Sequence, residues 1–575
     1  MTQAATQAAV NGTGSTPARW PTLWQRLLLT LIAAAAGSLL GLHGLSTPTP
    51  AGRDVRGFSA TRAAEVAQSL LGDAPRPAGS EASKLAVERL ADHLRRGGLE
   101  VQVDQATVKR QGKDVTIRNV IARRSGTRTG PSVLLMAHHD SAVGSPGAGD
   151  DGMGVAILLE AAESLYAEGP SRPWQGRDVI LLLTDGEESG LLGARHFVAN
   201  HPWHEHVGAV INIDNRGNGG PCLLYETSGD DARLLQAAGP ELGPVVANSL
   251  FAEVARRMPN STDLAVFREL GTPGLNFALV DGHQHYHAPT DTWQNASLSS
   301  LQHAGPLVIS AMQALADQPE DGTHMDGRAV FLDLGGAMLA WWPARAGITF
   351  ALGCTVVILG STVMGCKRRQ VRLIQLPPAA TAMLARALVA AAVSGGLLWV
   401  ASLIGLYGMD AAKSSNPEAG LLSVYRAAFW PTMGPALQGA CMVAGGVAAW
   451  LVTRPLLRRL DGMAGLWGSW VLSAVLVTMV AFAVPGVSAP LLPVLVTATV
   501  AIAVGVFVLD PEGPLPALLA LAAPAFVAGL TLAPVEALSW IGIGLSMPLF
   551  TAARAAIYAV LLLPALAASR GRLAA

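Results

Sequence analysis

The side chains best suited to chemistry stand directly after four apolar runs in the first half of the chain. After the run Val133–Met136 come His138 and Asp140, and a Gly/Pro/Ser-rich loop then leads to Asp150 and Asp151. The three later runs are also followed by carboxylates or imidazoles: Glu187 and Glu188 after Val179–Leu183, Asp214 after Val207–Ile213, and His283, His285 and His287 after Leu275–Val280. Imidazole and carboxylate donors without thiolate suit Zn²⁺, and less specifically Mn²⁺ or Co²⁺. The pattern therefore predicts a metal site.

The carboxylates outnumber those that one catalytic ion needs, which favours a centre of two ions. Such a centre requires a carboxylate that bridges the ions and a free carboxylate that takes a proton from the water between them. Asp150 suits the bridge, because its glycine-rich loop lets it approach both ions. Glu187 and Glu188 are adjacent where a strand gives way to a turn. One of them can therefore bind metal while the other acts as general base.

The same residues also have plain structural interpretations. An isolated His-x-Asp or Glu-Glu pair is more often solvated surface than a ligand pair. His139 should point away from His138, because side chains alternate along a strand, and His283 and His285 are expected to be loop histidines. Four strands that each deliver a ligand at the same end outweigh these interpretations. The metal centre is therefore the preferred hypothesis.

Near-continuous apolar strands that alternate with helical patterns must position these residues. Before them lie two helical patterns, Ser59–Leu71 and a second from Ser80 to the glycine pair at 97–98, and two β-type runs at 99–108 and 115–124. A helix at Leu298–Ala316 closes the domain. Such strands are typical of a sheet covered by helices on both faces. We predict an α/β domain over residues 52–320 with a mixed, mostly parallel sheet, whose ligands lie at the carboxyl ends of the strands.

Composition divides the 575-residue chain into a soluble and a membrane part. The net charge is −1, so nothing indicates a nucleic-acid partner. Charged residues concentrate before about Arg345, and the remainder is rich in Ala, Leu, Val and Gly. Of the four cysteines only Cys222 belongs to the soluble part. A disulfide within that domain is therefore excluded, and thiolates are not expected among the metal ligands.

Long apolar segments predict a membrane domain on either side of the soluble one. We interpret residues 1–22 as a cytoplasmic tail and 23–45 as a retained first transmembrane helix, with a cleaved signal peptide as the alternative. About seven further helices are expected within 346–568, at 346–366, 383–407, 432–453, 465–485, 490–509, 515–534 and 549–568. Basic clusters after two of them give eight spans, cytoplasmic termini and a soluble domain on the non-cytoplasmic side of a multi-pass protein. A ninth span at Ala533–Ser546 is the alternative.

Five motifs around the candidate ligands resemble those of a known family. They are AHHDS at 137–141, GAGDDGMG at 147–154, TDGEESGLLGARHF at 184–197, NIDNRGNGG at 212–220 and YHAPTDT at 286–292. In this order they resemble the co-catalytic zinc aminopeptidase family, which includes secreted bacterial leucyl aminopeptidases. The layout of spans resembles the membrane branch that contains the vacuolar membrane protease and the endoplasmic reticulum metallopeptidase. The resemblance in motifs covers about 53–317, and beyond that only the layout is similar.

The resemblance implies a role for each matching residue. One zinc ion would be held by His138, Asp150 and Asp214, and the other by Asp150, Glu188 and His287. Glu187 would be the general base, and Asp140 would orient His138 from behind, with Asp151 as a further supporting carboxylate. The peptide bond between Asp150 and Asp151 is expected to be cis. Four other positions are notable without an assigned role: Asp263 and Phe267 match a family segment near the substrate pocket, and Gly149 and Met153 depart from the usual residues.

The implied activity is hydrolysis of peptides by a di-zinc enzyme anchored in a lipid bilayer, most simply as an aminopeptidase. Three other classes remain open. The domain could be a catalytically silent receptor or scaffold, or an accessory to a transporter formed by the membrane part. A single-zinc cyclase of N-terminal glutamine shares the fold, but the intact Glu187–Glu188 pair disfavours it.

Overall fold

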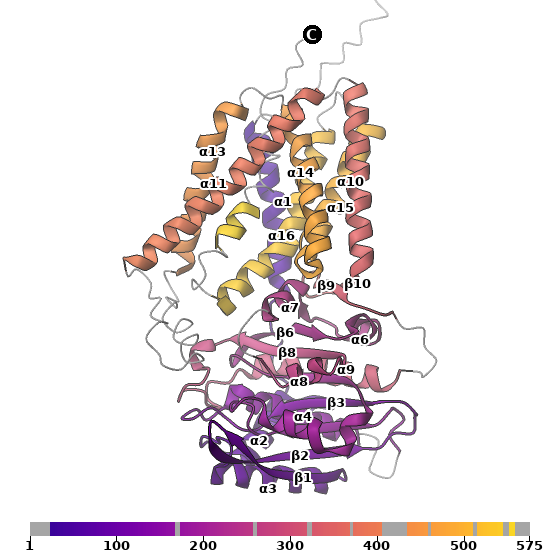
Figure 1. Ribbon diagram of the computed structural model, residues 1–575, viewed down its shortest axis with the longest axis vertical. Helices are drawn as coiled ribbons and strands as arrows, with labels where there is room; N and C mark the ends of the chain where they lie inside the picture. Colours follow the sequence, from indigo (N-terminus) through magenta and orange to yellow (C-terminus); the bar gives the residue numbers. More distant parts are fainter. Residues whose placement is uncertain are drawn as a thin grey trace, which may run out of the picture.

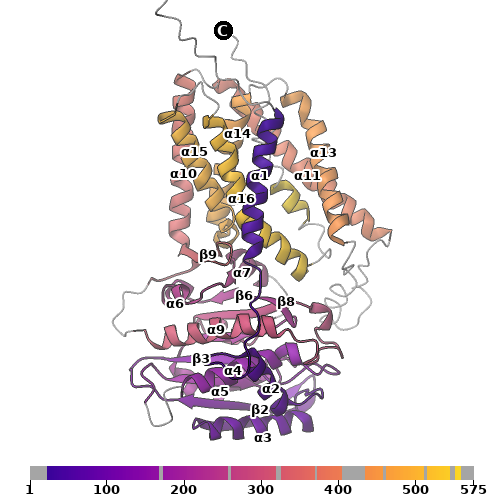
Figure 2. The same ribbon diagram turned by 180° about the vertical axis from the view of Figure 1, so that it is seen from behind.

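The computed structural model describes residues 23–166, 173–256, 261–318, 325–368, 372–404, 434–457, 462–509, 515–543 and 551–557. An α/β domain occupies one end of the molecule and a bundle of apolar helices the other (Figure 1). The view from behind shows the same division, with the first helix running along the bundle toward the α/β domain (Figure 2). The chain therefore passes through the bundle, folds the α/β domain and returns to the bundle.

An eight-stranded sheet forms the centre of the α/β domain, in the order β1-β2-β4-β3-β5-β8-β6-β7. The four middle strands β4 (Val179–Thr184), β3 (Ser132–His138), β5 (Val207–Ile213) and β8 (Gly274–Asp281) are parallel neighbours. The outer pairs β1–β2, β2–β4 and β6–β8 are antiparallel, and β6–β7 is parallel; these strands are β1 (Glu100–Arg110), β2 (Lys113–Arg124), β6 (Gly219–Ser228) and β7 (Val246–Ala247). The predicted fold class, a mixed and mostly parallel sheet, is confirmed.

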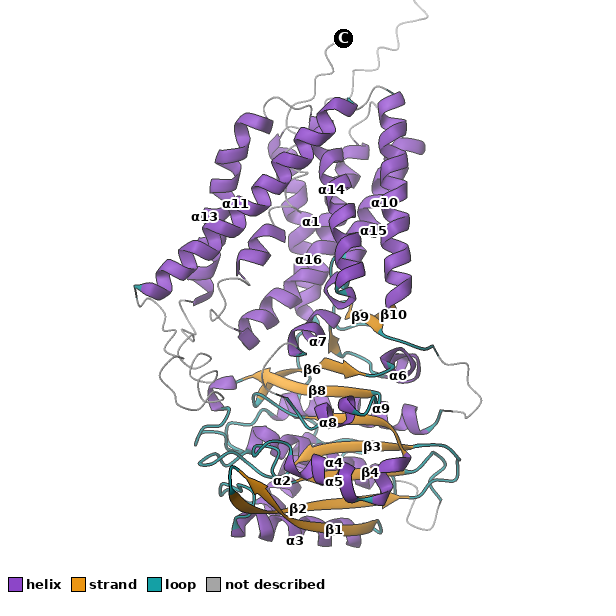
Figure 3. Cartoon of the chain, viewed as in Figure 1, coloured by secondary structure: helices purple, strands orange, loops and turns teal. Residues whose placement is uncertain are grey.

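Helices cover both faces of this sheet (Figure 3). Alternate residues of β3 separate the two cores: Val133 and Leu135 pack with one set of helices, and Leu134 and Met136 with the other. The first set is α2 (Ala60–Leu71), α3 (Glu81–Arg96), α4 (Met153–Ser164), α6 (Asp231–Ala238) and α9 (Leu298–Ala316); the second is α5 (Leu192–Asn200) and α8 (Leu264–Glu269). Burial on both faces explains why the central strands are apolar without alternation.

Serine side chains fix where three predicted helices begin. Ser59, Ser80 and Ser297 each precede a helix and accept a hydrogen bond from the backbone N–H three residues on. An N-cap of this kind stabilises a helix by about 1 kcal/mol. The predicted helices 59–71, 80–98 and 298–316 therefore agree with α2, α3 and α9.

A β-hairpin that the sequence did not predict extends the α/β domain beyond residue 320. Its strands are β9 (Ala329–Asp333) and β10 (Leu339–Pro343). Phe331 belongs to the main core, and the Asp333 carboxylate accepts a hydrogen bond of 3.1 Å from the backbone N–H of Ala247 in β7. The domain therefore continues to Pro343, and the next helix begins at Ala344.

Six helices in the described residues are long and apolar enough to cross a membrane. They are α1 (Leu23–His43), α10 (Ala344–Lys367), α11 (Leu376–Leu403), α13 (Gly434–Leu457), α14 (Gly462–Ala483) and α16 (Leu515–Ile543), and a shorter apolar helix, α15, spans Leu492–Phe507. The expected tail at 1–22 and most of the expected span 549–568 lie outside the described residues. The stretch 533–546, considered as a ninth span, continues α16 as far as Ile543.

Glycines allow α1 and α16 to pack backbone against backbone. A Cβ atom on Gly37 would lie 1.9 Å from the carbonyl oxygen of Phe526, and one on Gly41 would lie 2.5 Å from that of Leu530. Just past α1, Gly44 lies against Gly335 in the β9–β10 turn, where an added Cβ would meet backbone carbon at 2.3 Å. The start and the end of the α/β domain are therefore held at one point of the bundle.

Two further contacts between the bundle and the α/β domain involve α16 and a short turn near residue 486. Leu538 of α16 is buried against Leu223 of β6 and Val246 of β7. A short turn of the bundle, η7 (Pro485–Ser488), lies against α7 (Ser249–Ala255), where a Cβ on Gly486 would be 2.6 Å from the Glu253 side chain. The membrane-side edge of the sheet is therefore packed rather than exposed.

Candidate metal centre

The predicted ligands meet at the carboxyl ends of the four parallel strands. His138 ends β3, Glu187 and Glu188 follow β4, Asp214 follows β5, and His287 lies in the loop after β8. They form two groups, in each of which the possible ligand atoms lie within 4.8 Å of one another: His138, Glu187 and Asp214, and Asp150, Glu188 and His287. Because β4, β3, β5 and β8 are neighbours in the sheet, the topology itself brings these groups together.

The Asp150 carboxylate connects the two groups. Its Oδ1 lies 3.0 Å from His138 Nε2, and its Oδ2 lies 3.1 Å from His287 Nε2. His287 Nε2 is also 2.9 Å from Glu188 Oε2. Two imidazoles, one at the end of β3 and one in the loop after β8, thus face different oxygens of one carboxylate, which is the arrangement that a bridging ligand requires.

Asp140 holds His138 in this orientation. The ring Nδ1 of His138 lies 3.1 Å from the carbonyl oxygen of Asp140 and 3.4 Å from its Oδ1, so Nε2 is left to face the centre. Asp140 Oδ1 also accepts a hydrogen bond of 3.1 Å from the backbone N–H of Glu187. His139 points away, with Nε2 2.9 Å from the carbonyl oxygen of Arg118, as strand alternation predicted.

Hydrogen bonds fix the loop that carries Asp150. Asp291 accepts the backbone N–H of Gly149 at 2.7 Å on one oxygen and that of Asp150 at 3.1 Å on the other. Asn215 donates to the Gly149 carbonyl at 3.2 Å and to Asp151 Oδ1 at 2.9 Å. The peptide bond between Asp150 and Asp151 is cis, as predicted. A Cβ on Gly149 would lie 2.8 Å from Asp291 Oδ1, so a larger residue there would have to displace this carboxylate.

The other residues that the sequence singled out, Asp263, Phe267, His283 and His285, lie outside the two ligand groups. Asp263 is buried beside the end of β4, where its Oδ2 accepts a hydrogen bond of 2.5 Å from Thr184. Phe267 lies in the core of the second face, with its ring centroid 6.3 Å from that of Phe197. His283 and His285 belong to neither ligand group, and His285 Nδ1 lies 3.0 Å from Thr290 Oγ1.

Sequence reasoning missed Arg76 and gave no role to Asp291. Asp291 lies in the motif YHAPTDT at 286–292, but the two backbone N–H groups that it binds have no signature in the sequence. Arg76 is fully buried and donates to carbonyl oxygens of the β3–α4 loop. A lone arginine 74 positions before Asp150 gives no local pattern, so only the fold could reveal this contact.

Proximity and burial change how the ligand groups hold protons. Burial, and then the nearby Asp214, raise the pKa of Glu187 well above its ordinary value. Burial and then Asp150 raise the pKa of Glu188 to about 7. Burial opposes the charged form of His287, but its contacts with Asp150 and Glu188 raise the pKa to about 10. Carboxylates crowded in this way call for a compensating cation.

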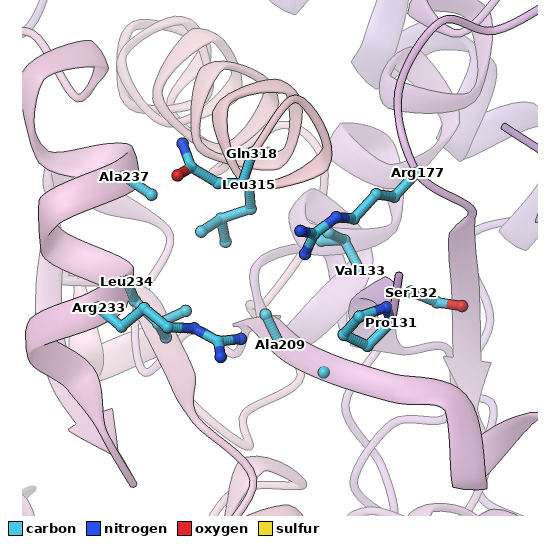
Figure 4. A pocket seen from close by; sticks show the side chains of 11 residues that line it. Pro131, Ser132, Val133, Arg177, Ala209, Arg233, Leu234, Ala237, Leu315 and Gln318 are labelled. Atoms are coloured by element: carbon cyan, nitrogen blue, oxygen red, sulfur yellow. The ribbon is translucent and has the colours of Figure 1, made fainter. Parts of the chain in front are cut away.

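A separate cavity lies at the opposite ends of the same strands. It is lined at the start of β3 by Ser132 and Val133 and at the start of β5 by Ala209, with Arg177 and Arg233 pointing into it (Figure 4). Since the ligand groups stand at the carboxyl ends of β3 and β5, this cavity is not part of the metal centre.

Comparison with a family model identifies the segment that carries the ligands. Residues 119–312 match the model of peptidase family M28, and all six residues of the two ligand groups fall within this range. The metallopeptidase family predicted from the motifs is therefore confirmed for this segment.

Two similar proteins are named as membrane or organellar peptidases. Endoplasmic reticulum metallopeptidase 1 of Mus musculus is 30% identical over 268 residues, which are 44% of this chain and 29% of that protein. The vacuolar membrane protease of Yarrowia lipolytica is 30% identical over 259 residues, which are 44% of this chain and 25% of that protein. The chain thus matches less than a third of the length of either relative.

Two solved structures illustrate the range of similar folds. An aminopeptidase from Aneurinibacillus sp. strain AM-1 gives a TM-score of 0.37 at 16% identity, covering 46% of this chain and 95% of that one. The glutaminyl cyclase of Porphyromonas gingivalis gives 0.36 at 24% identity, covering 45% and 100%. The fold assignment therefore rests on the sheet described above.

Proposed function

We propose that the protein is a membrane-anchored di-zinc metallopeptidase. The observation that carries this proposal is the Asp150 carboxylate, whose two oxygens face His138 and His287, each a member of a separate ligand group. His138, Asp150 and Asp214 would hold one ion, and Asp150, Glu188 and His287 the other. Glu187 is then the one acidic residue of the two groups that is free to handle protons.

The donor set fits zinc. Two imidazole nitrogens and carboxylate oxygens without sulfur are borderline donors that suit this ion. Glu188 Oε1 is buried and has no hydrogen-bond partner among the described residues, so the site leaves an oxygen available for a ligand bond. Burial, and then neighbouring carboxylates, raise the pKa values of Glu187 and Asp214, and a bound cation would offset both effects.

The chain's own residues account for the proton transfers of peptide hydrolysis. When bound, the two ions would supply Lewis acidity and lower the pKa of a water at the bridge. The Glu187 side chain is partly exposed and lies within the first ligand group, where it can take that proton and pass it to the leaving amine. Its backbone N–H is tied to Asp140, which also orients His138, so base and ligand are positioned by one carboxylate.

Replacing Glu187 tests this assignment. Glu187→Gln should keep two zinc ions per purified chain, because it removes no proposed ligand, but lose peptide hydrolysis by at least about 1000-fold. Metal content is measured by mass spectrometry and activity with fluorogenic peptides. Glu269→Gln on the surface is the matched control and should be fully active. Full activity of Glu187→Gln would sink the assignment, and a wild-type protein without bound metal would sink the proposed centre.

We further propose that the enzyme removes residues from free amino termini. The motifs that resemble co-catalytic aminopeptidases support this choice, since they surround every proposed ligand. Acetylating the amino terminus of a good peptide substrate should then abolish its cleavage, whereas amidating the carboxyl terminus should leave it unchanged. Cleavage of acetylated peptides at internal bonds would assign an endopeptidase instead.

The orientation in the membrane is also a proposal. Arg26 lies in the first turn of α1 and Lys367 ends α10, and both helices have their other end at the α/β domain. By the positive-inside rule the end remote from the α/β domain faces the cytoplasm. Protease added outside intact cells should therefore digest epitopes placed in the α/β domain, and protection of those epitopes would reverse the orientation.

A further inference from the structure

Arg76 is buried beneath the loop that separates two of the proposed ligands. The residue follows α2 in the chain and is 0% exposed. Its guanidinium donates three hydrogen bonds, each to a different backbone carbonyl: Nε to His139 at 3.0 Å, Nη1 to Pro146 at 2.6 Å and Nη2 to Gly147 at 3.0 Å. All three acceptors lie between His138 and Asp150 in the chain. One side chain therefore binds the loop that connects these two proposed ligands at three points.

The backbone of Arg76 takes part in the same attachment. Its N–H donates to Ser141 Oγ at 2.8 Å, and its carbonyl oxygen accepts from the Ser141 N–H at 3.1 Å. Ser141 Oγ in turn donates to the Ser145 carbonyl at 2.8 Å. The loop is therefore fixed at several points along its length, and a Cβ on Gly147 would meet Arg76 Nη2 at 3.3 Å.

The charges on the two sides of the loop are opposite. Arg76 binds carbonyl oxygens, while Asp291 binds the N–H groups of Gly149 and Asp150 from the other side. Burial lowers the pKa of Arg76 to about 10. This value is still well above 7, so the guanidinium is protonated at neutral pH. A planar guanidinium can bond three acceptors in different directions, whereas a lysine ammonium offers one nitrogen at the end of a flexible chain.

We propose that Arg76 is a positioning residue for the bridging carboxylate. By fixing residues 139–147 it sets where Asp150 stands relative to His138, so that one carboxylate can serve both ions. The identity of the ions rests on the proposed function, but the attachment of the loop does not.

Conservative replacement separates this role from a general contribution to stability. Arg76→Lys keeps the positive charge but loses the planar guanidinium that bonds three acceptors. The matched control is Arg62→Lys. Arg62 is bonded through Nε to Glu160 of α4 at 2.8 Å, away from the metal centre. Both variants of the full chain are titrated with Zn²⁺ and with Co²⁺ in detergent. Arg76→Lys should bind one ion about 10- to 100-fold more weakly than wild type, and Arg62→Lys should bind both normally.

Hydrogen exchange in the metal-free protein gives a second readout. In Arg76→Lys the amides of residues 139–150 should exchange at least about tenfold faster, while Arg62→Lys leaves them unchanged. Normal metal affinity together with normal exchange in Arg76→Lys would overturn the proposal, as would equal losses in both variants. If wild type binds fewer than two ions but Arg76→Lys still exchanges faster, the positioning role stands and the di-zinc function fails.

Discussion

Arg76 in the α/β domain and Arg386 in α11 of the helical bundle are both buried, but their surroundings differ. Arg76 is 0% exposed and bonds three carbonyl oxygens, with Asp140, Asp150 and Asp291 nearby. Arg386 is 2% exposed, and its Nε donates to Thr453 at 2.6 Å. Its two terminal nitrogens are buried without a hydrogen-bond partner among the described residues.

The difference shows what makes a buried charge tolerable. Removing a charge from water is costly unless partners replace the lost hydration. The metal centre supplies such partners for Arg76, because its carboxylates and the loop carbonyls are all negative or dipolar. In the described part of the bundle, Arg386 forms one hydrogen bond, which it donates to Thr453. The same residue type should therefore stabilise one region and destabilise the other.

Removing the metal should give the largest effect and confine it to the α/β domain. A ligand that binds only the folded state stabilises it by about 4 kcal/mol at a thousand times its Kd. Chelation should therefore lower the melting temperature of the α/β domain sharply and leave the α-helical circular dichroism of the bundle intact. Thermal scans at two wavelengths check this. A uniform shift of both signals would show that the two regions unfold together.

Replacing each arginine with methionine should destabilise the α/β domain but not the bundle. Arg76→Met removes three hydrogen bonds to loop carbonyls, of which only the Gly147 carbonyl keeps another donor in the described part of the chain, the N–H of Gly152. The change should destabilise the α/β domain by about 3–5 kcal/mol. Arg386→Met removes an incompletely paired charge and should be neutral or stabilise the bundle by about 1–4 kcal/mol. Thermal denaturation in detergent measures both, with Thr453→Val as the control for the single bond of Arg386. Equal destabilisation by the two changes would show that the two buried arginines contribute equally to stability, contrary to this prediction.

A smaller effect should appear in the protons that zinc displaces. Metal binding requires a deprotonated carboxylate and a neutral imidazole. Glu188, with a pKa of about 7, and His287, with a pKa of about 10, are both protonated below pH 7 in the metal-free protein. Glu188 loses its proton before zinc binds once the pH exceeds 7, so zinc binding should release about one proton fewer near pH 8.5 than near pH 6. Calorimetry in buffers of different ionisation heat measures this, and release that rises with pH would contradict it.

The parts of the structure that the sequence predicted are those with a local pattern. The candidate ligands directly follow the apolar strands β3, β4, β5 and β8 in the sequence, so the strand ends were enough to find the candidates. The choice of single ligands among them came from the family resemblance. β6 begins with Gly219, Gly220 and Pro221. These residues are weak strand formers, so the sequence did not predict this strand. The span expected at 383 begins earlier, at Leu376, because prolines are tolerated in the first turn of a helix.

The parts that escaped prediction depend on distant backbone contacts. Arg76 acts on three carbonyl groups, which every residue possesses, so its target carries no side-chain signature. The β9–β10 hairpin is two strands of five residues whose core partner, β7, is itself only two residues long. Neither hydrophobic periodicity nor motif spacing can predict contacts between such short strands.

The close packing of α1 on α16 has a consequence for how the protein is made. Phe526, whose carbonyl touches Gly37, is synthesised 489 positions after it. At about 5–20 residues per second, the first helix waits on the order of a minute for its partner. During that time the glycine face of α1 is open to lipid or to any insertion factor present. A ribosome-stalled chain that ends before α16 should therefore expose Gly37 and Gly41 to crosslinking, and the released full chain should protect them.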